Sequence, residues 1–501
     1  MTSLTLRPHR LLAGALAFLA TFAAAARAEV RCPPLFSDHL VLQRDRPVPV
    51  WGTAAAGETV TVEFGSQQQR TIADAEGHWR VDLAAMPASD QGGSLVIVGE
   101  NRLTFEDVLV GEVWFCSGQS NMEKPIGPRP RQRATEGYDL DLASSGQPLL
   151  RLFQVPRSDL PQTGEGVLRW LPCSADALQQ STFSAAAYHF GRHLQHTLGI
   201  PVGLIHSSFG GTRIEAWLPL EAFQSDPRLH GLEKSTYQAW VPGVQPTELY
   251  ASMVRPYAPF AVRGFLWYQG ETNLMAGDIA LYAAKQAALV ASWRKAFENP
   301  DAPFYCALLA PFSYSAWPGL SPAPTPEALP AFWEAQASIV LLPRGDFIVL
   351  TDGAANVRDI HPPDKRLVGE RFARLALAQT YGRTDILPAG PRYRQHEVAG
   401  EQVRITFAHA QGLHSRDGQP LQEFTLAGDD RVFHPADAKI EKDQVLVSSP
   451  AVPHPVAVRF AWRDTPTSNL VNVVGLPAAP FRTDLWPLVL EQPSSASAAK
   501  P

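Results

Sequence analysis

The sequence has little of what marks metalloproteins, disulfide-stapled domains or nucleic-acid-binding proteins. It contains four cysteines among 501 residues and neither a C-x-x-C nor an H-E-x-x-H spacing, so no metal site is predicted. Four cysteines allow three disulfide pairings and their spacing favours none, while Cys116 and Cys306 lie in apolar runs and are expected to be buried thiols. The formal charge of -6 argues against nucleic-acid binding, because nucleic-acid-binding domains are usually basic.

Long apolar runs are confined to the N-terminus, so the mature chain is expected to have no membrane span. The run at 11–26 follows two arginines and ends in an A-x-A cleavage signal, which predicts a secretory signal peptide cut after Ala28. An uncleaved N-terminal anchor is the alternative interpretation. Removal of residues 1–28 takes away three arginines and no acidic residue, which moves the formal charge from -6 to about -9. We therefore predict a periplasmic or secreted protein.

The rest of the chain changes pattern twice along its length. Near the start, Val60, Val62 and Phe64 alternate with polar residues, and similar alternation returns after about residue 393, as in strands buried on one face. In between, strand-like runs alternate with helical spacing, which predicts a parallel sheet covered by helices on both faces. The predicted parts are the signal peptide 1–28, an N-terminal β-sandwich-like domain 29–107, an α/β catalytic domain 108–390, a C-terminal β domain 391–490 and a disordered tail 491–501.

Helices, strands and loops of the α/β part are predicted from the spacing of apolar residues and from helix stop signals. The predicted helices are 183–198 with Ser181 as its N-cap, 278–297 and 365–379. The predicted strands include 202–206, 304–309 and 347–350. Two proline-rich segments, 124–133 and 318–330, are predicted to be long loops near the carboxyl ends of strands, where α/β sheets bind ligands.

One stretch has the form of a strand that presents a serine. Residues 112–121 read E-V-W-F-C-S-G-Q-S-N, so an apolar run stops at Gly118 and Ser120 follows two residues later. A nucleophile suits this position, because the side chain lies at the open edge of a sheet and the following amides can stabilise an oxyanion. Taken alone, the stretch also fits a strand that ends in a serine-rich turn.

Three later stretches also place polar or glycine-rich sequence directly after a strand-like run. In 206–217 the pair Gly210-Gly211 would let the backbone approach a ligand and point an amide at it. In 264–273 an apolar run ends in polar residues that include Gln269 and Asn273, whose amides could donate to an oxyanion.

The last of the three stretches, 351–363, brings Asp359 two residues before His361. A carboxylate can fix the tautomer of an imidazole so that the other ring nitrogen takes the proton of a serine. A lone Asp-x-His occurs often by chance. The order serine, glycine, amide and Asp-His along one α/β region favours a catalytic interpretation of the whole set.

This ordered set resembles the sialate O-acetylesterase family of carbohydrate esterases, within the wider SGNH-hydrolase group. The matching motifs cover nearly the whole mature chain. They are L-F-S-D-H-L-V-L-Q-R at 35–44, V-P-V-W-G at 48–52, G-E-V-W-F-C-S-G-Q-S-N-M-E at 111–123, G-G-T-R-I-E-A-W, W-Y-Q-G-E-T-N, D-I-H-P, and G-L-P-A-A-P-F-R-T-D at 475–484. The resemblance implies an SGNH-like three-layer catalytic domain that hydrolyses O-acetyl esters on sugars without a metal or an organic cofactor.

Residue roles carried over by motif make Ser120 the nucleophile, His361 the general base and Asp359 its orienting partner. The resemblance also implies an oxyanion hole built from the backbone amides of Ser120 and Gly211. For the third donor, a side chain of the W-Y-Q-G-E-T-N stretch is implied, with Gln269 preferred to Asn273.

Two departures from the wider group leave alternatives open. Many SGNH hydrolases place the aspartate three residues before the histidine, but Arg358 occupies that position. Either Asp359 serves from two residues away, or Asp352 replaces it, or the site is a Ser-His dyad. The serine motif also lacks the second glycine of G-x-S-x-G, which argues against an α/β-hydrolase elbow.

Other hypotheses concern the substrate and the base. A non-catalytic carbohydrate-binding protein and an esterase for acetylated xylan or another plant polysaccharide compete with a sialate O-acetylesterase. His206 is a second candidate base, because it lies at a strand end. The oligomeric state and the role of the two β domains are left open. Three arginines in the proline-rich loop either attract an anionic sugar or are simply solvated; they are Arg129, Arg131 and Arg133.

Overall fold

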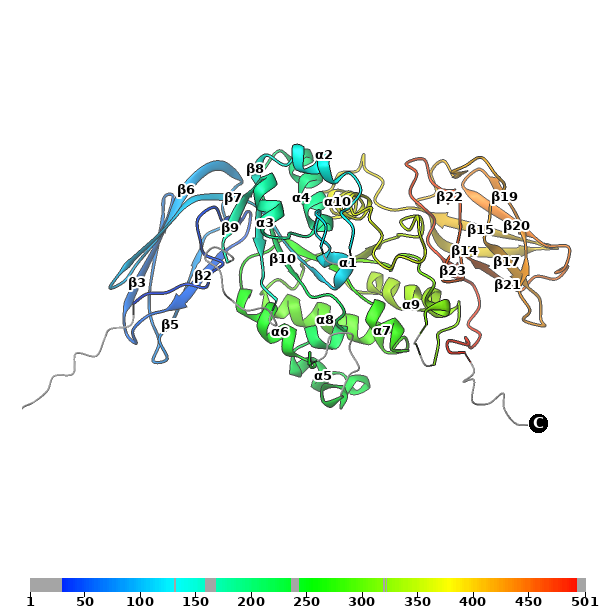
Figure 1. Cartoon of the computed structure of the whole chain (residues 1–501), viewed down its shortest axis with the longest axis horizontal. Helices are drawn as coiled ribbons and strands as arrows, with labels where there is room; N and C mark the ends of the chain where they lie inside the picture. The colour runs from blue at the N-terminus through cyan, green and yellow to red at the C-terminus, as the bar shows by residue number, and fades with distance from the viewer. Residues whose placement is uncertain are drawn as a thin grey trace, which may run out of the picture.

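The structure is a computed structural model that describes residues 29–129, 132–157, 168–235, 243–318, 320 and 322–492. The predicted signal peptide and most of the predicted tail lie outside the described residues. Figure 1 shows a helix-rich middle, with β2 to β6 on one side of it and β14 to β23 on the other. No described helix is long and apolar enough to cross a membrane.

The middle of the molecule is built on a sheet in the order β13-β12-β11-β7-β10-β8-β9. All neighbours from β13 to β8 are parallel, and β9 alone pairs antiparallel with β8, so the sheet is mixed rather than wholly parallel as predicted. Its strands are β7 (Arg102–Gly118), β8 (Gln147–Gln154), β9 (Trp170–Cys173), β10 (Val202–Ser208), β11 (Gly264–Tyr268), β12 (Phe304–Ala307) and β13 (Gly345–Ile348). The central strands β10, β11 and β12 are buried over their whole length, as expected for a sheet covered on both faces.

Helices lie on both sides of this sheet. Figure 1 shows α4 and α10, which pack against each other, above the strands and α6 and α8 below them. The α-helices are α1 (Ser120–Glu123), α2 (Tyr138–Ala143), α3 (Ala175–Gln180), α4 (Ala185–Leu198), α5 (Leu220–Ser225), α6 (Glu248–Met253), α7 (Glu271–Met275), α8 (Tyr282–Ala296), α9 (Ala328–Ala337) and α10 (Arg366–Gln379). Short 3₁₀ helices are η1 (Ile214–Trp217), η2 (Pro227–Leu229), η3 (Leu232–Lys234), η4 (Arg255–Tyr257), η5 (Tyr314–Ala316) and η6 (Ser338–Leu341).

The central strand β7 links the N-terminal strands to the parallel sheet. Its first half pairs with β6 and β1, and its second half pairs with β10 and β11. The chain therefore runs through residues 107 and 108 without a break in the strand, and one hydrophobic core extends from Val30 to Leu377. The N-terminal strands are β1 (Val41–Gln43), β2 (Val48–Thr53), β3 (Thr59–Phe64), β4 (Gln67–Ile72), β5 (His78–Leu83) and β6 (Ser89–Val98). The predicted alternation at Val60, Val62 and Phe64 is confirmed in β3.

A buried carboxylate fixes the middle of β7. Glu112 is fully buried and accepts hydrogen bonds from Arg44, from Gln43 at 3.3 Å, and from Arg263 at 2.6 and 3.0 Å. Arg44 follows β1 and Arg263 precedes β11. The carboxylate therefore joins three segments at the start of the half of β7 that pairs with β10 and β11. A buried charge is stable only when paired and hydrogen-bonded, which these partners provide.

The C-terminal strands form a second hydrophobic core around Val403, Ile405 and Phe407. These strands are β14 (Arg392–Ala399), β15 (Gln402–Ala408), β16 (His414–Ser415), β17 (Phe424–Ala427), β18 (His434–Pro435), β19 (Asp437–Glu441), β20 (Gln444–Ser448), β21 (Ala457–Phe460), β22 (Leu470–Val471) and β23 (Phe481–Arg482). Among the described residues, these strands pair with one another only in antiparallel fashion.

Several predicted boundaries are wrong for local physical reasons. Helix α4 is capped by Ser184, whose hydroxyl accepts from the N–H of Ala187 at 3.1 Å, whereas the hydroxyl of Ser181 donates to the last turn of α3. Helix α8 begins at Tyr282 rather than at Asp278; the Asp278 carboxylate precedes the helix and pairs with Arg213 outside it and with Lys285 in its first turn. In the second proline-rich segment, Pro330 lies in the first turn of α9, where its missing N–H has no intrahelical partner to lose.

All four cysteines are free thiols. Cys116 and Cys306 are buried in the central strands β7 and β12, as the sequence predicts. Burial raises the pKa of both thiols, so both are uncharged at neutral pH.

Candidate active site

The four stretches singled out in the sequence meet at the carboxyl edge of the parallel sheet. Gly118, the last residue of β7, pairs in register with Ser208 of β10 on one side and with Tyr268 of β11 on the other. Backbone hydrogen bonds continue beyond the strands, from Gln119 N–H to the Tyr268 carbonyl at 3.0 Å and from Phe209 N–H to the Gly118 carbonyl at 3.1 Å. The residues that follow the three strands are therefore neighbours in space.

Ser120 is the first residue of α1, directly after the turn at Gly118. Gly118 has a φ of 150°, and a Cβ there would lie 2.0 Å from the carbonyl oxygen of Tyr268, so no other residue fits. The turn brings the half-buried Ser120 to the edge of the sheet at the start of a helix. Within the described part of the chain, no group accepts a hydrogen bond from the N–H of Ser120.

The glycine pair after β10 packs against the serine. A Cβ on Gly210 would lie 3.1 Å from the Cβ of Ser120 and 2.7 Å from Oε2 of Glu123. The N–H of Gly210 donates to the same Glu123 oxygen at 3.2 Å, whereas no described group accepts from the N–H of Gly211. Gly211 has a φ of 76°, a left-handed conformation that favours glycine.

The amide side chains after β11 hold the loops of the site together. Gln269 is fully buried, and its Nε2 donates to Oδ1 of Asn273 at 2.7 Å, to Oε1 of Gln119 at 3.1 Å and to the Thr212 carbonyl at 3.2 Å. Asn273 is also fully buried, and its Nδ2 donates to the carboxylates of Glu215 and Asp278. These contacts join the turn before Ser120, the glycine loop and α7, and the N–H groups of both amides are directed at protein acceptors.

His361 and Asp359 lie in the loop between β13 and α10. Oδ1 of Asp359 accepts from the backbone N–H of His361 at 2.9 Å. Burial and, after it, the positive charge of Lys365 lower the pKa of His361 to about 4, against the charge of Asp359, which acts in the opposite direction. Across the residues that the structure describes, no hydrogen bond joins the imidazole ring to Ser120 or to the Asp359 carboxylate. Such bonds are often long in enzymes without substrate and tighten in the complex.

Asp352 and His206, the alternative candidates for the orienting carboxylate and the base, have other contacts in the structure. The carboxylate of Asp352 forms ion pairs with Arg371 at 2.7 Å and Arg416 at 2.8 Å. The ring of His206 is buried, with Nδ1 at 2.7 Å from Oε1 of Gln154, and burial lowers its pKa to about 3.

One residue of the site was not singled out by the sequence. Asn121 follows the serine and is 1% exposed, and its Nδ2 donates to the Ile360 carbonyl at 2.9 Å. The last letter of G-Q-S-N is the only sequence signal for it. A contact across 239 residues is not readable from local pattern.

Basic side chains gather near the serine around Glu123. Its carboxylate accepts from Arg129 at 3.2 Å and from Arg157 at 3.4 Å. The Arg133 carbonyl accepts from the ammonium of Lys124 at 2.7 Å, and Arg131 lies outside the described residues. Arg129 is thus anchored by a carboxylate rather than simply solvated.

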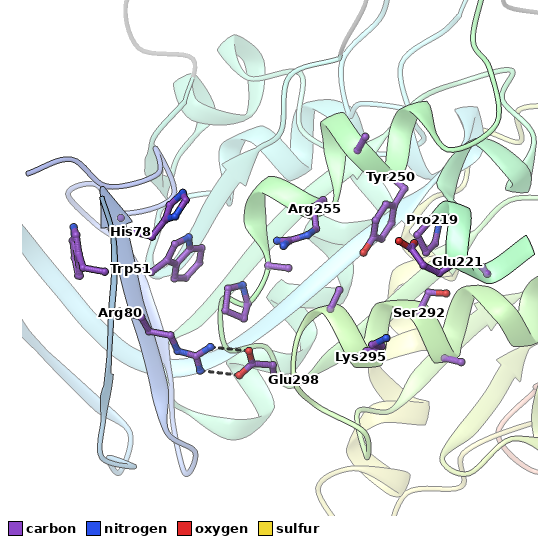
Figure 2. Close-up of a pocket in the computed structure, with 18 of the residues that line it drawn as sticks. Trp51, His78, Arg80, Pro219, Glu221, Tyr250, Arg255, Ser292, Lys295 and Glu298 are labelled. Atoms are coloured by element: carbon purple, nitrogen blue, oxygen red, sulfur yellow. Dashed lines mark hydrogen bonds and ion pairs between the residues drawn. The ribbon is translucent and has the colours of Figure 1, made fainter. Parts of the chain in front are cut away.

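A large cavity lies elsewhere, between the N-terminal strands and the helices below the sheet. Its volume is about 1360 Å³, and Figure 2 shows Trp51, Tyr250 and Arg255 along it and the ion pair of Arg80 with Glu298, which measures 2.7 Å. None of its lining residues belongs to the four stretches, so the cavity is separate from the candidate site. No group of three or more His, Cys, Asp or Glu side chains is arranged to hold a metal ion in the described ranges.

Comparison with known proteins gives a consistent result. A family model described as "Carbohydrate esterase, sialic acid-specific acetylesterase" matches residues 110–324. The crystal structure of a carbohydrate acetylesterase from Xanthomonas citri superposes with a TM-score of 0.80 and 34% sequence identity, over 91% of this chain and 100% of that one. The human sialate O-acetylesterase is 26% identical over 488 residues, which cover 89% of this chain and 91% of the human protein. The rat sialate O-acetylesterase is likewise 26% identical, over 509 residues that cover 89% of this chain and 92% of the rat protein.

These relationships identify the protein as a carboxylic ester hydrolase. The chain belongs to the sialate O-acetylesterase family of carbohydrate esterases.

Proposed function

We propose that this protein is an exported serine esterase that removes O-acetyl groups from carbohydrates and acts as a sialate O-acetylesterase. The observation that supports this most is the meeting of Ser120, the glycine pair and the His361 loop at one edge of the sheet, although the chain carries them far apart. The family relationship, which extends over 89–91% of the chain, supports an acetylated sugar as the substrate.

In the proposed reaction, Oγ of Ser120 attacks the acetyl carbonyl while the neutral ring of His361 takes the hydroxyl proton. The tetrahedral oxyanion is bound by the backbone N–H groups of Ser120 and Gly211. Collapse of this intermediate expels the sugar oxygen, which takes the proton from His361, and leaves an acetyl-serine. The same histidine then activates a water molecule, which hydrolyses the acetyl-serine and releases acetate.

The remaining predicted residues take supporting roles in this proposal. Asp359 places His361 through its backbone N–H and its charge stabilises the imidazolium formed during the reaction. The sequence predicts Gln269 or Asn273 as the third oxyanion donor. Because both amides donate to protein acceptors, the proposal gives the hole two backbone donors and assigns these side chains to holding the glycine loop in place.

The proposal includes the organisation of the whole protein. A signal peptide cut after Ala28 would direct the chain to the periplasm or the medium. An SGNH-like three-layer domain at 108–390 would carry the chemistry, and small β domains at 29–107 and 391–490 would flank it. No metal or organic cofactor takes part in the proposed chemistry.

The substrate is tested by acetate release from 9-O-acetylated sialic acid beside acetylated xylan, with Ser120→Ala protein as the matched control. Acetylated xylan is the second candidate, because the Xanthomonas citri relative carries the broader description of a carbohydrate acetylesterase. Faster release from the sialic acid supports the proposal. Release from xylan alone would replace the substrate class, and release from neither, at concentrations that saturate related esterases, would contradict the proposal.

A further inference from the structure

A buried polar cluster lies directly beside the proposed nucleophile and takes no part in the steps above. Asn121 in α1, Glu271 in α7 and Lys365 at the start of α10 are 1%, 2% and 1% exposed. They come from three segments of the chain. Apolar side chains could fill the same space without the free-energy cost of removing charged groups from water. Retention of two buried charges and an amide therefore needs a reason beyond packing.

The amide of Asn121 is the centre of the cluster. Its Nδ2 donates to Oε1 of Glu271 at 2.5 Å and to the Ile360 carbonyl at 2.9 Å, and its Oδ1 accepts from Nζ of Lys365 at 2.6 Å. Rotation of the amide by 180° would place its oxygen against two acceptors and its nitrogen against an ammonium donor. The three partners therefore fix the orientation of the side chain.

This arrangement joins the two catalytic segments by one hydrogen bond. Asn121 is the residue after Ser120, and Ile360 is the residue before His361. The Asn121-to-Ile360 bond thus sets the separation of nucleophile and base, which otherwise come from loops on β7 and β13. An error of about 1 Å in such a separation can reduce the rate by about 10².

The charge of Lys365 acts on His361. Burial lowers the pKa of Lys365 to about 7, so its ammonium is charged at the lower pH where His361 titrates. Lys365 is also acted on by Lys124, Glu271, Asp359 and Asp364, and its Nζ lies 5.5 Å from the centre of the Tyr268 ring. The groups that act on His361 are Lys365, Lys124 and Arg129, which disfavour its protonation, and Asp359, which favours it.

Glu271 gives a second, independent indication that the cluster does more than fill space in the core. Its Oε2 is buried and has no hydrogen-bond partner among the described residues. Burial raises the pKa of this carboxyl, while Asn121 and the charge of Lys365 act in the opposite direction. An unpaired buried carboxylate oxygen is costly, and a functional role is one physical explanation for keeping it.

We propose that Asn121, Glu271 and Lys365 form a positioning network, in which Asn121 ties the His361 loop to the nucleophile turn and the ammonium of Lys365, bound to the Asn121 amide, opposes the protonation of His361. Glu271 balances the buried ammonium and holds the amide. The network rests on the proposed roles of Ser120 and His361, because it acts only through them.

The tether is tested with Asn121→Ala. Loss of the bond to Ile360 should lower kcat by about 10–10² with KM changed less than about threefold, since the substrate contacts remain. Wild-type kcat in folded Asn121→Ala protein would overturn the tether.

The charge is tested by the pH dependence of kcat/KM in Lys365→Met and Lys365→Arg proteins. Removal of the ammonium should move the acid limb of the profile upward by about 0.5–1 pH unit, and arginine, which keeps the charge, should restore it. Arg366→Met is the matched control, because it removes a charge from the next residue, whose side chain bonds to Asp141 at 2.8 Å. An acid limb in Lys365→Met that coincides with wild type, or an equal shift in Arg366→Met, would overturn the electrostatic role.

Two further comparisons distinguish a failure of the network from a failure to fold or a failure of the proposed function. If Lys365→Met does not fold, Lys365→Gln, which keeps a hydrogen-bond donor without charge, is measured in its place and the same shift is expected. High activity in Ser120→Ala would refute the proposed function itself. Inactive Ser120→Ala together with wild-type kcat in Asn121→Ala and wild-type profiles in the Lys365 proteins would refute the network alone.

Discussion

Replacement of Gly210 by alanine tests how closely the glycine loop packs against Ser120, the proposed nucleophile. The added Cβ would lie 2.7 Å from Oε2 of Glu123 and 3.1 Å from the Cβ of Ser120. The carboxylate cannot simply swing away, because it accepts from the N–H of Gly210 itself and from Arg129. The serine turn is held by the bond from Gln119 to the Tyr268 carbonyl, so the loop and the turn must separate by a few tenths of an ångström.

The expected cost has two parts. Insertion of a methyl group into a filled site costs about 1–3 kcal/mol of stability. The small displacement of the Gly211 N–H from the proposed oxyanion position should lower kcat by about 10–10². Complete loss of an oxyanion donor would lower kcat more, by roughly 10²–10³.

The assay is the hydrolysis of an acetyl ester by wild-type, Gly210→Ala and Gly146→Ala proteins, each checked for folding by thermal unfolding. Gly146 is the matched control, because a Cβ there meets no atom within 4 Å and its φ is not in the left-handed region. Gly146→Ala should behave as wild type. A folded Gly210→Ala protein with wild-type kcat would show that the glycine loop does not bound the nucleophile as we describe.

Three other predictions follow from the charges of the fold. Burial lowers the pKa of His361 to about 4, so kcat/KM should be constant at mildly acidic pH and fall only below about pH 4, where the ring gains a proton. A fall in kcat/KM centred near pH 6.5 would contradict this. His361→Ala should lower kcat by about 10²–10⁴, because it removes the proposed general base. Asp359→Asn should lower kcat much less, because the Asp359 carboxylate binds the backbone N–H of His361 and not its ring. Glu112→Ala should lower the free energy of unfolding in urea by about 3–5 kcal/mol, because it leaves Arg44 and Arg263 without their buried partner; a loss below about 1 kcal/mol would contradict this.

The positions of the proposed catalytic residues could be predicted because they follow from local sequence. Apolar runs that end in Gly118, before Gly210 and before Gln269 predict parallel strands, and parallel strands place their carboxyl ends at one edge. The glycine at 118 is required by the carbonyl of Tyr268, which only a residue without a side chain can approach. Chain order and strand direction are therefore enough to bring these residues together.

The contacts that hold the site could not be predicted, because they join residues far apart in sequence. Asn121 and Ile360 are separated by 239 residues, and no pattern around either one names its partner. The same holds for the antiparallel direction of β9, which is set by its pairing with β8. The wrong N-cap at Ser181 has a local cause: two serines three residues apart both precede the helix, and it is the Ser184 hydroxyl that accepts from the N–H of Ala187.

The most direct measurement of the central claim is the site of acetylation during turnover. Wild-type protein is mixed with an acetyl ester, quenched in acid within the first turnover, digested and analysed by mass spectrometry. We predict one acetyl group on the peptide that contains Ser120, and none on that peptide in Ser120→Ala protein, which should also fail to release acetate. Acetylation at another residue, or acetate release by Ser120→Ala at the wild-type rate, would contradict the assignment of Ser120 as the nucleophile.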